Sequence, residues 1–292
     1  MIISQIIGGL GNQMFQHAVG RSLALDTGQL LSLDVSLFSD YKLHQGFELL
    51  RVFDGATRIA SDADVNKILG WQSPALIRRV LRHSTFSYVR SKSFVVEPCF
   101  NYWPGIRRVR SNCYLSGYWQ SEKYFEKHAI AIRNDFTFRP LDTSENIELA
   151  AEIKKKNAIG LHIRRGDYVN NSATLAVHGI CSIDYYQTAV RFIADLVENP
   201  HVFIFSDDIK WAEKNLNIAL PCTYIDHNHG KSSYIDMQLM AMCKNNIIAN
   251  STFSWWGAWL NPRPEKIVIA PKQWFASGKP VPDLYPDGWI VL

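Results

Sequence analysis

Residues 1–15 read MIISQIIGGLGNQMF, and this stretch decides the fold class of the chain. The apolar run from Met1 to Ile7 is typical of a buried strand, and a glycine-rich turn, Gly8-Gly9-Leu10-Gly11-Asn12, follows it at once. Apolar residues at helical spacing then predict a helix that ends at Gly28, and residues 30–35 predict a second strand. Strand, glycine turn, helix and strand in this order indicate a parallel α/β unit.

Strand and helix patterns alternate more clearly in the second half of the chain. The predicted strands are 158–163, 201–205, 223–226, 246–249 and 266–270, and the predicted helices are 145–157, 183–198, 209–216, 231–243 and 253–260. This alternation predicts a sheet of nucleotide-binding type, in which ligands lie at the carboxyl ends of the strands. We place a domain boundary between Arg139 and Asn157, which gives domains 1–145 and 146–292.

The composition excludes several classes of protein. The chain has 292 residues, 47% of them hydrophobic, which is enough for one large domain or two of moderate size. The net charge of +4 permits an anionic ligand but does not indicate a nucleic-acid-binding protein. The apolar run at the N-terminus is too short for a signal peptide, and no segment is long enough to span a bilayer. The scattered, odd-numbered cysteines argue against a disulfide framework, so we expect a cytoplasmic protein.

Two adjacent arginines, Arg164 and Arg165, follow the predicted strand 158–163. Guanidinium groups match phosphate oxygens in geometry and charge, so these side chains are candidates for phosphate binding. The alternative is a structural ion pair between one arginine and an acid such as Asp167.

Acidic residues follow the next predicted strand, in the string Ser206-Asp207-Asp208. Acids at this position often bind ribose hydroxyls or base N–H groups. Ser206 or Asp208 could instead cap the helix that begins at Ile209, and the two aspartates could divide these tasks.

A polar string, Asn250-Ser251-Thr252-Phe253-Ser254, follows the strand 246–249 and opens a helix rich in tryptophan. The unpaired N–H groups and the positive dipole end of a helix start suit a phosphate. Ordinary capping above a tryptophan core is the alternative interpretation.

Metal signals are weak. Asp62-Ala63-Asp64 has the spacing by which many sugar transferases bind a divalent ion, but it follows Ser61 and opens a helical pattern. We therefore interpret it as a helix cap. His227 and His229 lack further ligands nearby and are interpreted as a surface turn. No metal site and no cofactor are expected.

Taken together, four strings resemble the bacterial α-1,2-fucosyltransferases of glycosyltransferase family 11. They are residues 8–16 (GGLGNQMFQ), 162–168 (HIRRGDY), 205–208 (FSDD) and 251–260 (STFSWWGAWL), in order across nearly the whole chain. The resemblance implies a GT-B fold, with two Rossmann-like domains that face a cleft. Residues 1–145 would form the acceptor side and residues 146–292 would bind GDP-fucose, the co-substrate.

The activity that the resemblance implies is inverting, metal-independent transfer of L-fucose from GDP-β-L-fucose to the 2-hydroxyl of a terminal galactose. By the same resemblance, the β-phosphate is bound by Arg164 with support from Arg165, and guanine is read by His162 and Asp207. The other expected donor-binding residues are Gly9, Leu10, Gly11, Asn12, Gln13, Ser206, Asp208, Asn250, Ser251, Thr252 and Ser254.

The acceptor hydroxyl is a weak nucleophile, so a general base is expected. Asp167 is our first candidate because it is the acid nearest to the arginines, and structural pairing with Arg165 is its competing role. His17 is the second candidate.

Other functions were compared with this one. A sugar-binding protein of periplasmic type would need a signal peptide, and an NAD-dependent oxidoreductase would need G-x-G-x-x-G. Transfer of another GDP-linked sugar, or nucleotide-sugar binding without catalysis, remains an alternative. Seven arginines lack the aromatic pattern of an RNA-binding protein: Arg78, Arg79, Arg82, Arg90, Arg107, Arg108 and Arg110. If the acceptor is a lipid-linked glycan, they could contact anionic lipid head groups and hold the protein peripherally at the inner face of the plasma membrane. The alternative is a solvated basic face.

Overall fold

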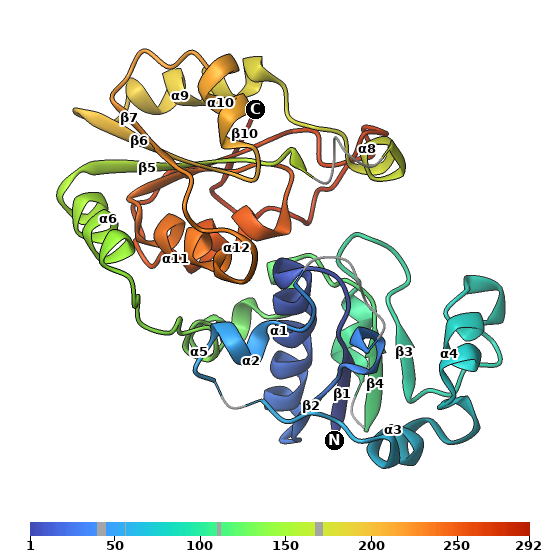
Figure 1. Cartoon of the computed structure of the whole chain (residues 1–292). Helices are drawn as coiled ribbons and strands as arrows, with labels where there is room; N and C mark the ends of the chain where they lie inside the picture. The colour runs from blue at the N-terminus through green and yellow to red at the C-terminus, as the bar shows by residue number, and fades with distance from the viewer. Residues whose placement is uncertain (40–44, 56, 110–111, 167–171) are drawn as a thin grey trace. The chain divides into compact units, whose positions relative to one another are not determined.

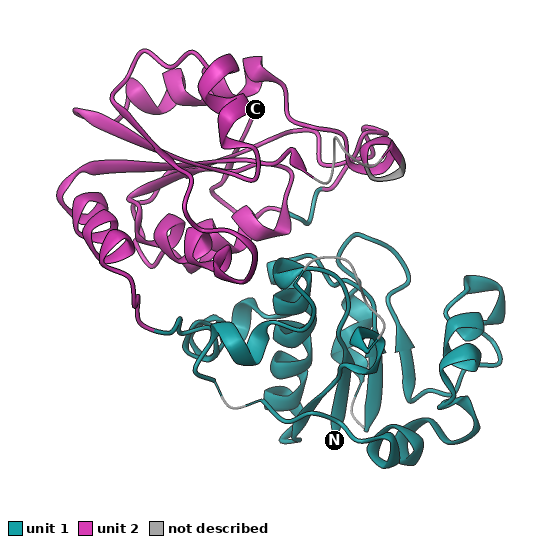
Figure 2. Cartoon of the chain, viewed as in Figure 1, with its two compact units in different colours: residues 1–139, 282–284 teal, residues 140–281, 285–292 magenta. Residues whose placement is uncertain are grey.

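Two parallel sheets form in separate parts of the chain (Figures 1 and 2). The computed structural model describes residues 1–39, 45–55, 57–109, 112–166 and 172–292, apart from the side chains of residues 173 and 174. Unit 1 comprises Met1–Arg139 and Pro282–Leu284, and unit 2 comprises Pro140–Val281 and Tyr285–Leu292. The division therefore falls at Arg139/Pro140, where the sequence had placed it at residue 145. The return of three late residues to unit 1 was not predicted.

The sheet of unit 1 has the strand order β2-β1-β4-β3, and all neighbouring strands are parallel. Its strands are β1 (Ile2–Gln5), β2 (Leu31–Asp34), β3 (Phe94–Val96) and β4 (Cys113–Ser116). The sequence analysis missed β3, because three residues are too few to show a period.

Helix α1 (Leu10–Thr27) follows β1 as predicted and packs against it. Gly8 makes the turn with φ of +80°, and Gly28 ends the helix in the left-handed conformation with φ of +64°. Both positions favour glycine because a Cβ atom is strained there. The local glycine pattern thus fixes both ends of α1.

The other helices of unit 1 are short. They are α2 (Leu49–Val52), α3 (Asp62–Leu69), α4 (Ala75–Leu81) and α5 (Ala129–Asp135), with 3₁₀ turns η1 (Ser36–Phe38), η2 (Gly70–Gln72), η3 (Ser84–Phe86), η4 (Pro104–Arg108), η5 (Glu122–Tyr124) and η6 (Glu126–His128). The capping interpretation of the Asp62–Asp64 string is confirmed at α3. Ser61 accepts from the N–H of Asp64, and the Asp64 carboxylate accepts from the N–H of Ser61 and pairs with Arg58 at 3.1 Å.

The sheet of unit 2 has the order β10-β9-β8-β5-β6-β7, again with parallel neighbours. Its strands are β5 (Asn157–Ile163), β6 (Pro200–Ser206), β7 (Cys222–Ile225), β8 (Asn245–Ile247), β9 (Val268–Ala270) and β10 (Ile290–Val291). The predicted alternation of strands and helices is confirmed, and β10 adds an edge strand that the sequence analysis did not predict.

Helices cover both faces of this sheet (Figure 1). They are α6 (Ser144–Lys155), α8 (Ser172–His178), α9 (Ile183–Ala194), α10 (Ile209–Asn215), α11 (Tyr234–Met242) and α12 (Thr252–Leu260), with the 3₁₀ turn η7 (Gly230–Ser232). Side chains of β5 and β6 alternate, so that Ile159 and Ile204 pack under α9 and α10, while Ala158 and Phe203 pack under α6 and α11. Burial on both faces explains why these strands are apolar throughout.

The described part of the chain contains no helix that is both long and apolar enough to cross a membrane.

Candidate functional site

Three loops with polar side chains follow neighbouring strands of unit 2. β8, β5 and β6 are adjacent in the sheet, and Ile163 at the end of β5 pairs with Ser206 at the end of β6. Parallel strands end at the same edge, so the loops that begin at Arg164, Asp207 and Ile248 share the carboxyl edge of the sheet. This is the edge at which ligands of such sheets bind.

Asp207 connects the loop after β6 to the arginine loop after β5. Its Oδ2 lies 2.9 Å from Nη1 of Arg164, and its Oδ1 accepts from the backbone N–H of Arg165 at 2.8 Å. The side chains of Arg164 and Asp207 are 24% and 25% exposed, so the pair is accessible from solvent. The expected ion pair of an arginine is thus present with Asp207. Asp167, named as partner and as base, lies outside the described residues.

Gly166 allows the two loops to approach each other closely. A Cβ atom on Gly166 would lie 2.9 Å from Oδ2 of Asp207, so any larger residue would displace the carboxylate that holds Arg164. Close packing against Asp207 therefore explains why position 166 is a glycine.

Arg165 has different surroundings from Arg164. Its Cζ lies 3.6 Å from the centroid of the Trp211 ring, and its Nε lies 3.7 Å from Oδ2 of Asp208. Stacking on tryptophan restrains a guanidinium group while leaving its edge able to donate. Trp211 was missed by the sequence analysis, because nothing in the sequence shows which loop the first turn of α10 contacts.

Of the two candidate caps, Ser206 and Asp208, the structure confirms Asp208. Asp208 is the N-cap of α10 and accepts from the N–H of Trp211 at 3.2 Å, while the Ser206 hydroxyl accepts from the N–H of Asp208 at 3.0 Å. Asp208 is thus engaged with the helix, and Asp207 faces the arginine loop.

His162, the penultimate residue of β5, is buried. Its ring centroid lies 5.5 Å from that of Phe253, and its Nδ1 has no hydrogen-bond partner among the described residues. Burial lowers the pKa of His162 to about 4, while the charge of Asp207 opposes this shift. The imidazole is therefore neutral near pH 7.

Helix α12 begins beside this edge with Ser251 as its N-cap, which accepts from the N–H of Phe253 at 3.3 Å. The buried Ser254 hydroxyl donates to the carbonyl of Ser251 at 3.2 Å, and Thr252 is half-buried. The tryptophans behind this turn form core, as the alternative interpretation predicted: Trp255, Trp256 and Trp259. Capping and a free helix start are compatible, because the cap satisfies only part of the first-turn N–H groups.

Asn250 has a structural role that the sequence did not indicate. Its amide donates to the carbonyls of His178 at 2.9 Å and Trp274 at 3.3 Å, and its Oδ1 accepts from Cys181 at 3.4 Å. The side chain therefore joins two loops to the start of α12.

The glycine turn of unit 1 is held mainly by Gln13. The buried Gln13 amide donates to the carbonyls of Gly8 at 2.9 Å and Gly46 at 2.8 Å. The half-buried Asn12 accepts from Gln120 at 2.9 Å. Leu10 is buried, whereas Gly9 is the N-cap of α1 and has no side chain to cap it. The N–H of Gln13 donates to the carbonyl of Gly9 at 3.1 Å, and that of Leu10 donates to the Glu48 carboxylate; Gly11 is also buried.

His17 is removed as a candidate base. It is 5% exposed, its ring lies 5.2 Å from that of Phe136, and its Nε2 lies 4.0 Å from Oδ2 of Asp135. Burial lowers the pKa of His17 to about 4, with Asp135 opposing the shift. A base must reach the proton that it removes, and this ring is enclosed in the interior of unit 1.

Arg78 is also corrected, because it does not belong to a basic surface. It is buried and pairs with Asp34 and with the hydroxyl of Tyr114. Arg79, Arg107 and Arg108 are exposed, and Arg110 lies outside the described residues.

Histidines of the predicted surface turn have local partners. His227 lies 2.9 Å from Oδ1 of Asn146, and His229 lies 3.5 Å from Asp226. The residues that the structure describes contain no group of three or more His, Cys, Asp or Glu that could hold a metal ion.

A family model described as glycosyl transferase family 11 matches residues 107–292. An α-1,2-colitosyltransferase of Escherichia coli is 35% identical over 295 residues, which cover 100% of this chain and 99% of that protein. The chain belongs to glycosyltransferase family 11. The O-antigen biosynthesis glycosyltransferase WbnK of Escherichia coli is 34% identical over 307 residues, covering 99% of both chains. Galactoside 2-α-L-fucosyltransferase SEC1 of Bos taurus is 23% identical over 262 residues, covering 87% of this chain and 62% of that one.

Solved structures confirm the GT-B fold of this family 11 glycosyltransferase. The fucosyltransferase NodZ from Bradyrhizobium has a TM-score of 0.55 at 18% identity and covers 92% of this chain and 94% of its own. A variant of Arabidopsis thaliana FUT1 in complex with GDP has a TM-score of 0.53 at 14% identity and covers 92% of this chain and 70% of its own. At these identities the likeness concerns the fold alone.

Proposed function

We propose that the chain transfers L-fucose from GDP-β-L-fucose to the 2-hydroxyl of a terminal galactose, with inversion, during synthesis of an O-antigen-type glycan. Support comes from its family and from relatives that are named as a galactoside 2-α-L-fucosyltransferase and as an O-antigen biosynthesis glycosyltransferase.

The pairing of Arg164 with Asp207 is the observation that carries the proposal. Departure of GDP builds negative charge on the β-phosphate, and fixed positive groups must stabilise that charge. Arg164 is already oriented by the 2.9 Å contact with Asp207, and α12 begins at the same edge of the sheet. A guanidinium group has five N–H donors, so it can bind phosphate oxygens while still donating to Asp207.

Guanine is proposed to bind Asp207 and the neutral His162. Each carboxylate oxygen has two lone pairs, and the contacts with Arg164 and Arg165 use only one on each side. The remaining pair can accept from N1–H and N2–H of guanine, whereas adenine offers no matching donors. Arg165, Ser251 and Thr252 are proposed to support the diphosphate, and Ser206, Asp208, Asn250 and Ser254 to hold the loops that form this site.

Metal-independent catalysis is part of the proposal. The carboxylate of Asp64 is engaged with Ser61 and Arg58, and Arg164 supplies positive charge by itself. Unit 1 is proposed to bind the acceptor. Its glycine turn is proposed to contact the diphosphate and fucose of the donor through Gly9, Leu10, Gly11, Asn12 and Gln13. Asp167 remains the proposed general base, which would take the proton of the attacking hydroxyl in a single displacement.

A second candidate donor is GDP-colitose, because a relative with 35% identity is named as an α-1,2-colitosyltransferase. Colitose is the 3-deoxy counterpart of fucose, so the two donors differ by one hydroxyl group. A site that hydrogen-bonds this hydroxyl rejects the deoxy sugar strongly, whereas a site that ignores it accepts both.

The test is a donor panel of GDP-L-fucose, GDP-colitose, GDP-mannose and UDP-galactose with a β-galactoside acceptor, with product linkage determined by NMR. We expect transfer from GDP-L-fucose to the galactose 2-hydroxyl. Turnover of GDP-colitose alone would reassign the donor, and transfer from none of the GDP-sugars would refute the proposal.

A further inference from the structure

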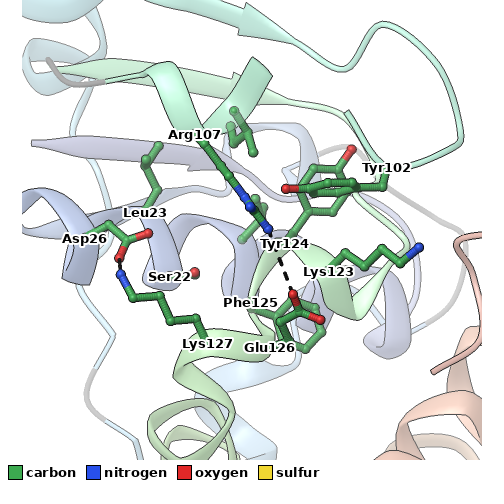
Figure 3. Close-up of a pocket in the computed structure, with 12 residues that line it drawn as sticks. Ser22, Leu23, Asp26, Tyr102, Arg107, Lys123, Tyr124, Phe125, Glu126 and Lys127 are labelled. Atoms are coloured by element: carbon green, nitrogen blue, oxygen red, sulfur yellow. Dashed lines mark hydrogen bonds and ion pairs between the residues drawn. The ribbon is translucent and has the colours of Figure 1, made fainter. Parts of the chain in front are cut away.

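A pocket of about 500 Å³ is lined entirely by residues of unit 1 (Figure 3). Its residues come from the second half of α1 and from two later segments: Val19, Ser22, Leu23, Asp26, Tyr102, Ile106, Arg107, Lys123, Tyr124, Phe125, Glu126 and Lys127. Pockets of about 300–1,000 Å³ accommodate small organic ligands. The pocket is therefore large enough for one or more sugar rings.

Aromatic rings form one wall of this pocket. Tyr102 and Tyr124 meet edge to face with ring centroids 4.9 Å apart, and Cζ of Arg107 lies 5.6 Å from the centroid of Tyr102. Figure 3 shows these three side chains on the same side of the pocket. Aromatic faces pack against apolar C–H groups, which a pyranose ring presents on one face.

The charged side chains of the pocket are balanced. Arg107 lies 3.9 Å from Glu126, Lys127 lies 2.6 Å from Asp26, and Lys123 lies 2.5 Å from Asp283, which is not itself a lining residue. A nucleotide or phosphate ligand is favoured by an excess of positive charge, and the pairs in this lining leave none. Alternating donors and acceptors instead suit hydroxyl groups, because each hydroxyl both donates and accepts. The lining therefore favours a neutral, polyhydroxylated ligand.

Two buried polar atoms of this wall lack partners among the described residues. They are the hydroxyl oxygen of Tyr102 and Nε1 of Trp119, whose ring meets that of Tyr124 at 5.3 Å. Unsatisfied buried polar groups are rare in native proteins. Of these two residues only Tyr102 lines the pocket, so its unpartnered hydroxyl is the atom that a hydrogen-bonding ligand could satisfy.

The aromatic wall continues to the carboxyl edge of the unit 1 sheet. Trp119 lies in the loop after β4 with φ of +57°, and its backbone N–H donates to the Glu97 carboxylate at 2.9 Å. The next residue, Gln120, donates to Asn12 in the glycine turn at 2.9 Å. A sugar chain that begins at this edge could thus extend into the pocket.

We propose that this pocket binds the sugar units of the acceptor glycan that precede the galactose being modified. The position of the galactose follows from the proposed function, on which this assignment rests. The class of ligand follows from the residues that line the pocket. Tyr102 supplies ring packing, while Arg107 and Glu126 bind hydroxyl groups of the sugar.

The experiment compares acceptors of different length on the full chain. We would measure kcat/KM for methyl β-D-galactoside and for lacto-N-tetraose and lacto-N-neotetraose, using wild type, Tyr102→Ala and Arg107→Ala. The charge-matched control is Arg79→Ala, on the exposed surface of α4. Wild type should prefer a tetrasaccharide, and each pocket variant should lose about tenfold on it, or about 1.4 kcal/mol. All variants should retain the wild-type rate on methyl galactoside and the wild-type donor KM.

Ligand-observed NMR with GDP-saturated protein provides a second readout that requires no turnover. The proposal predicts that saturation transfer from the protein to the tetrasaccharide is observed with wild type and Arg79→Ala. It should be weaker with the pocket variants, whichever donor sugar the enzyme uses. Failure of the donor panel with normal length-dependent binding would refute only the proposed function. Pocket variants that treat the tetrasaccharides as wild type does, or that lose equally on both acceptor lengths, would overturn the pocket assignment.

Discussion

Oδ2 of Asp207 lies 2.9 Å from Nη1 of Arg164, and this contact joins the ends of two neighbouring strands. An arginine at a strand end has many rotamers, and ordering it on binding costs free energy. Asp207 fixes the guanidinium group before any ligand arrives. Preorganised positive charge of this kind is the main requirement for stabilising a leaving diphosphate.

Replacement of Arg164 tests whether this guanidinium group acts on the leaving group. We expect Arg164→Ala to reduce kcat with GDP-fucose by at least about a hundredfold, since one lost donor at developing charge costs about 3 kcal/mol. Arg164→Lys should recover little, because an ammonium group cannot form two parallel contacts. Circular dichroism checks the fold. A near-normal kcat in a folded Arg164→Ala protein would make the arginine structural.

Asp207 and Asp208 provide a matched pair for testing donor binding. Asp207→Asn should weaken GDP binding at least about tenfold, because the loss of a charged hydrogen-bond partner costs about 1.5–3 kcal/mol. Asp208→Asn should change it much less, since Asp208 caps α10. Calorimetric titration with GDP and UDP measures both, and the preference for GDP should shrink only in Asp207→Asn.

A double-mutant cycle separates the two roles of Asp207. If Asp207 acts through Arg164, the effects of Asp207→Asn and Arg164→Ala on GDP affinity will be less than additive. Full additivity would show that Asp207 binds the nucleotide independently of the arginine, and equal GDP affinity in wild type and Asp207→Asn would move the base-reading role to His162.

Chelation tests metal independence. Enzyme treated with EDTA should retain most of its rate, because the proposed positive charge comes from Arg164 and the start of α12. Loss of activity that manganese restores would instead implicate carboxylates such as Asp62 and Asp64. The variant Asp64→Asn would then lose activity, whereas we expect it only to weaken the cap of α3.

Asp236 gives unit 2 a pH-dependent stability. Burial raises the pKa of Asp236 to about 7, although Asn228 donates to it at 2.8 Å. The folded state holds this proton more tightly than the unfolded state, so the stabilisation is complete at low pH and is lost as pH rises through about 7. The free energy of unfolding of Asp236→Asn, measured relative to that of wild type, should therefore rise by about 2–3 kcal/mol from pH 5 to pH 8.

Urea unfolding at both pH values measures this difference, with Asp195→Asn on the exposed end of α9 as control. The control should follow wild type at both pH values. A pH-independent difference between Asp236→Asn and wild type would mean that the carboxyl group is ionised throughout.

Gly8 and Gly28 both have a positive φ, and substituting them distinguishes the effect of backbone strain from that of a steric clash. An added Cβ on Gly8 would lie 2.8 Å from Nδ2 of Asn12, whereas one on Gly28 meets nothing within 4 Å. Gly8→Ala and Gly28→Ala should each lose about 1 kcal/mol of stability from the unfavourable φ. Only Gly8→Ala should also lower transfer activity, because it displaces the Asn12 side chain. Equal activity in both variants would exclude a functional role for the glycine turn.

Local patterns were sufficient for most of the fold and for part of the site. The glycines around α1 and the acids at the start of α3 and α10 act on their own neighbours, so the sequence shows them directly. The contact of Arg165 with Trp211, the clamp made by Asn250 and the burial of His17 depend on residues distant in sequence. No local pattern records such contacts, and the three-residue strand β3 is too short to have one.

The return of Pro282–Leu284 to unit 1 has a consequence for biosynthesis. Residues 1–139 of unit 1 are synthesised before unit 2, and domains generally fold in the order of synthesis. Within unit 1, Lys123 pairs with Asp283 at 2.5 Å and the N–H of Tyr102 donates to Asp283 at 3.1 Å, so both contacts need a residue that is synthesised after residues 140–281 of unit 2. Unit 1 is therefore begun before unit 2 but gains these contacts only after most of unit 2 has been synthesised, and a nascent chain stalled before residue 282 holds a first unit that lacks them.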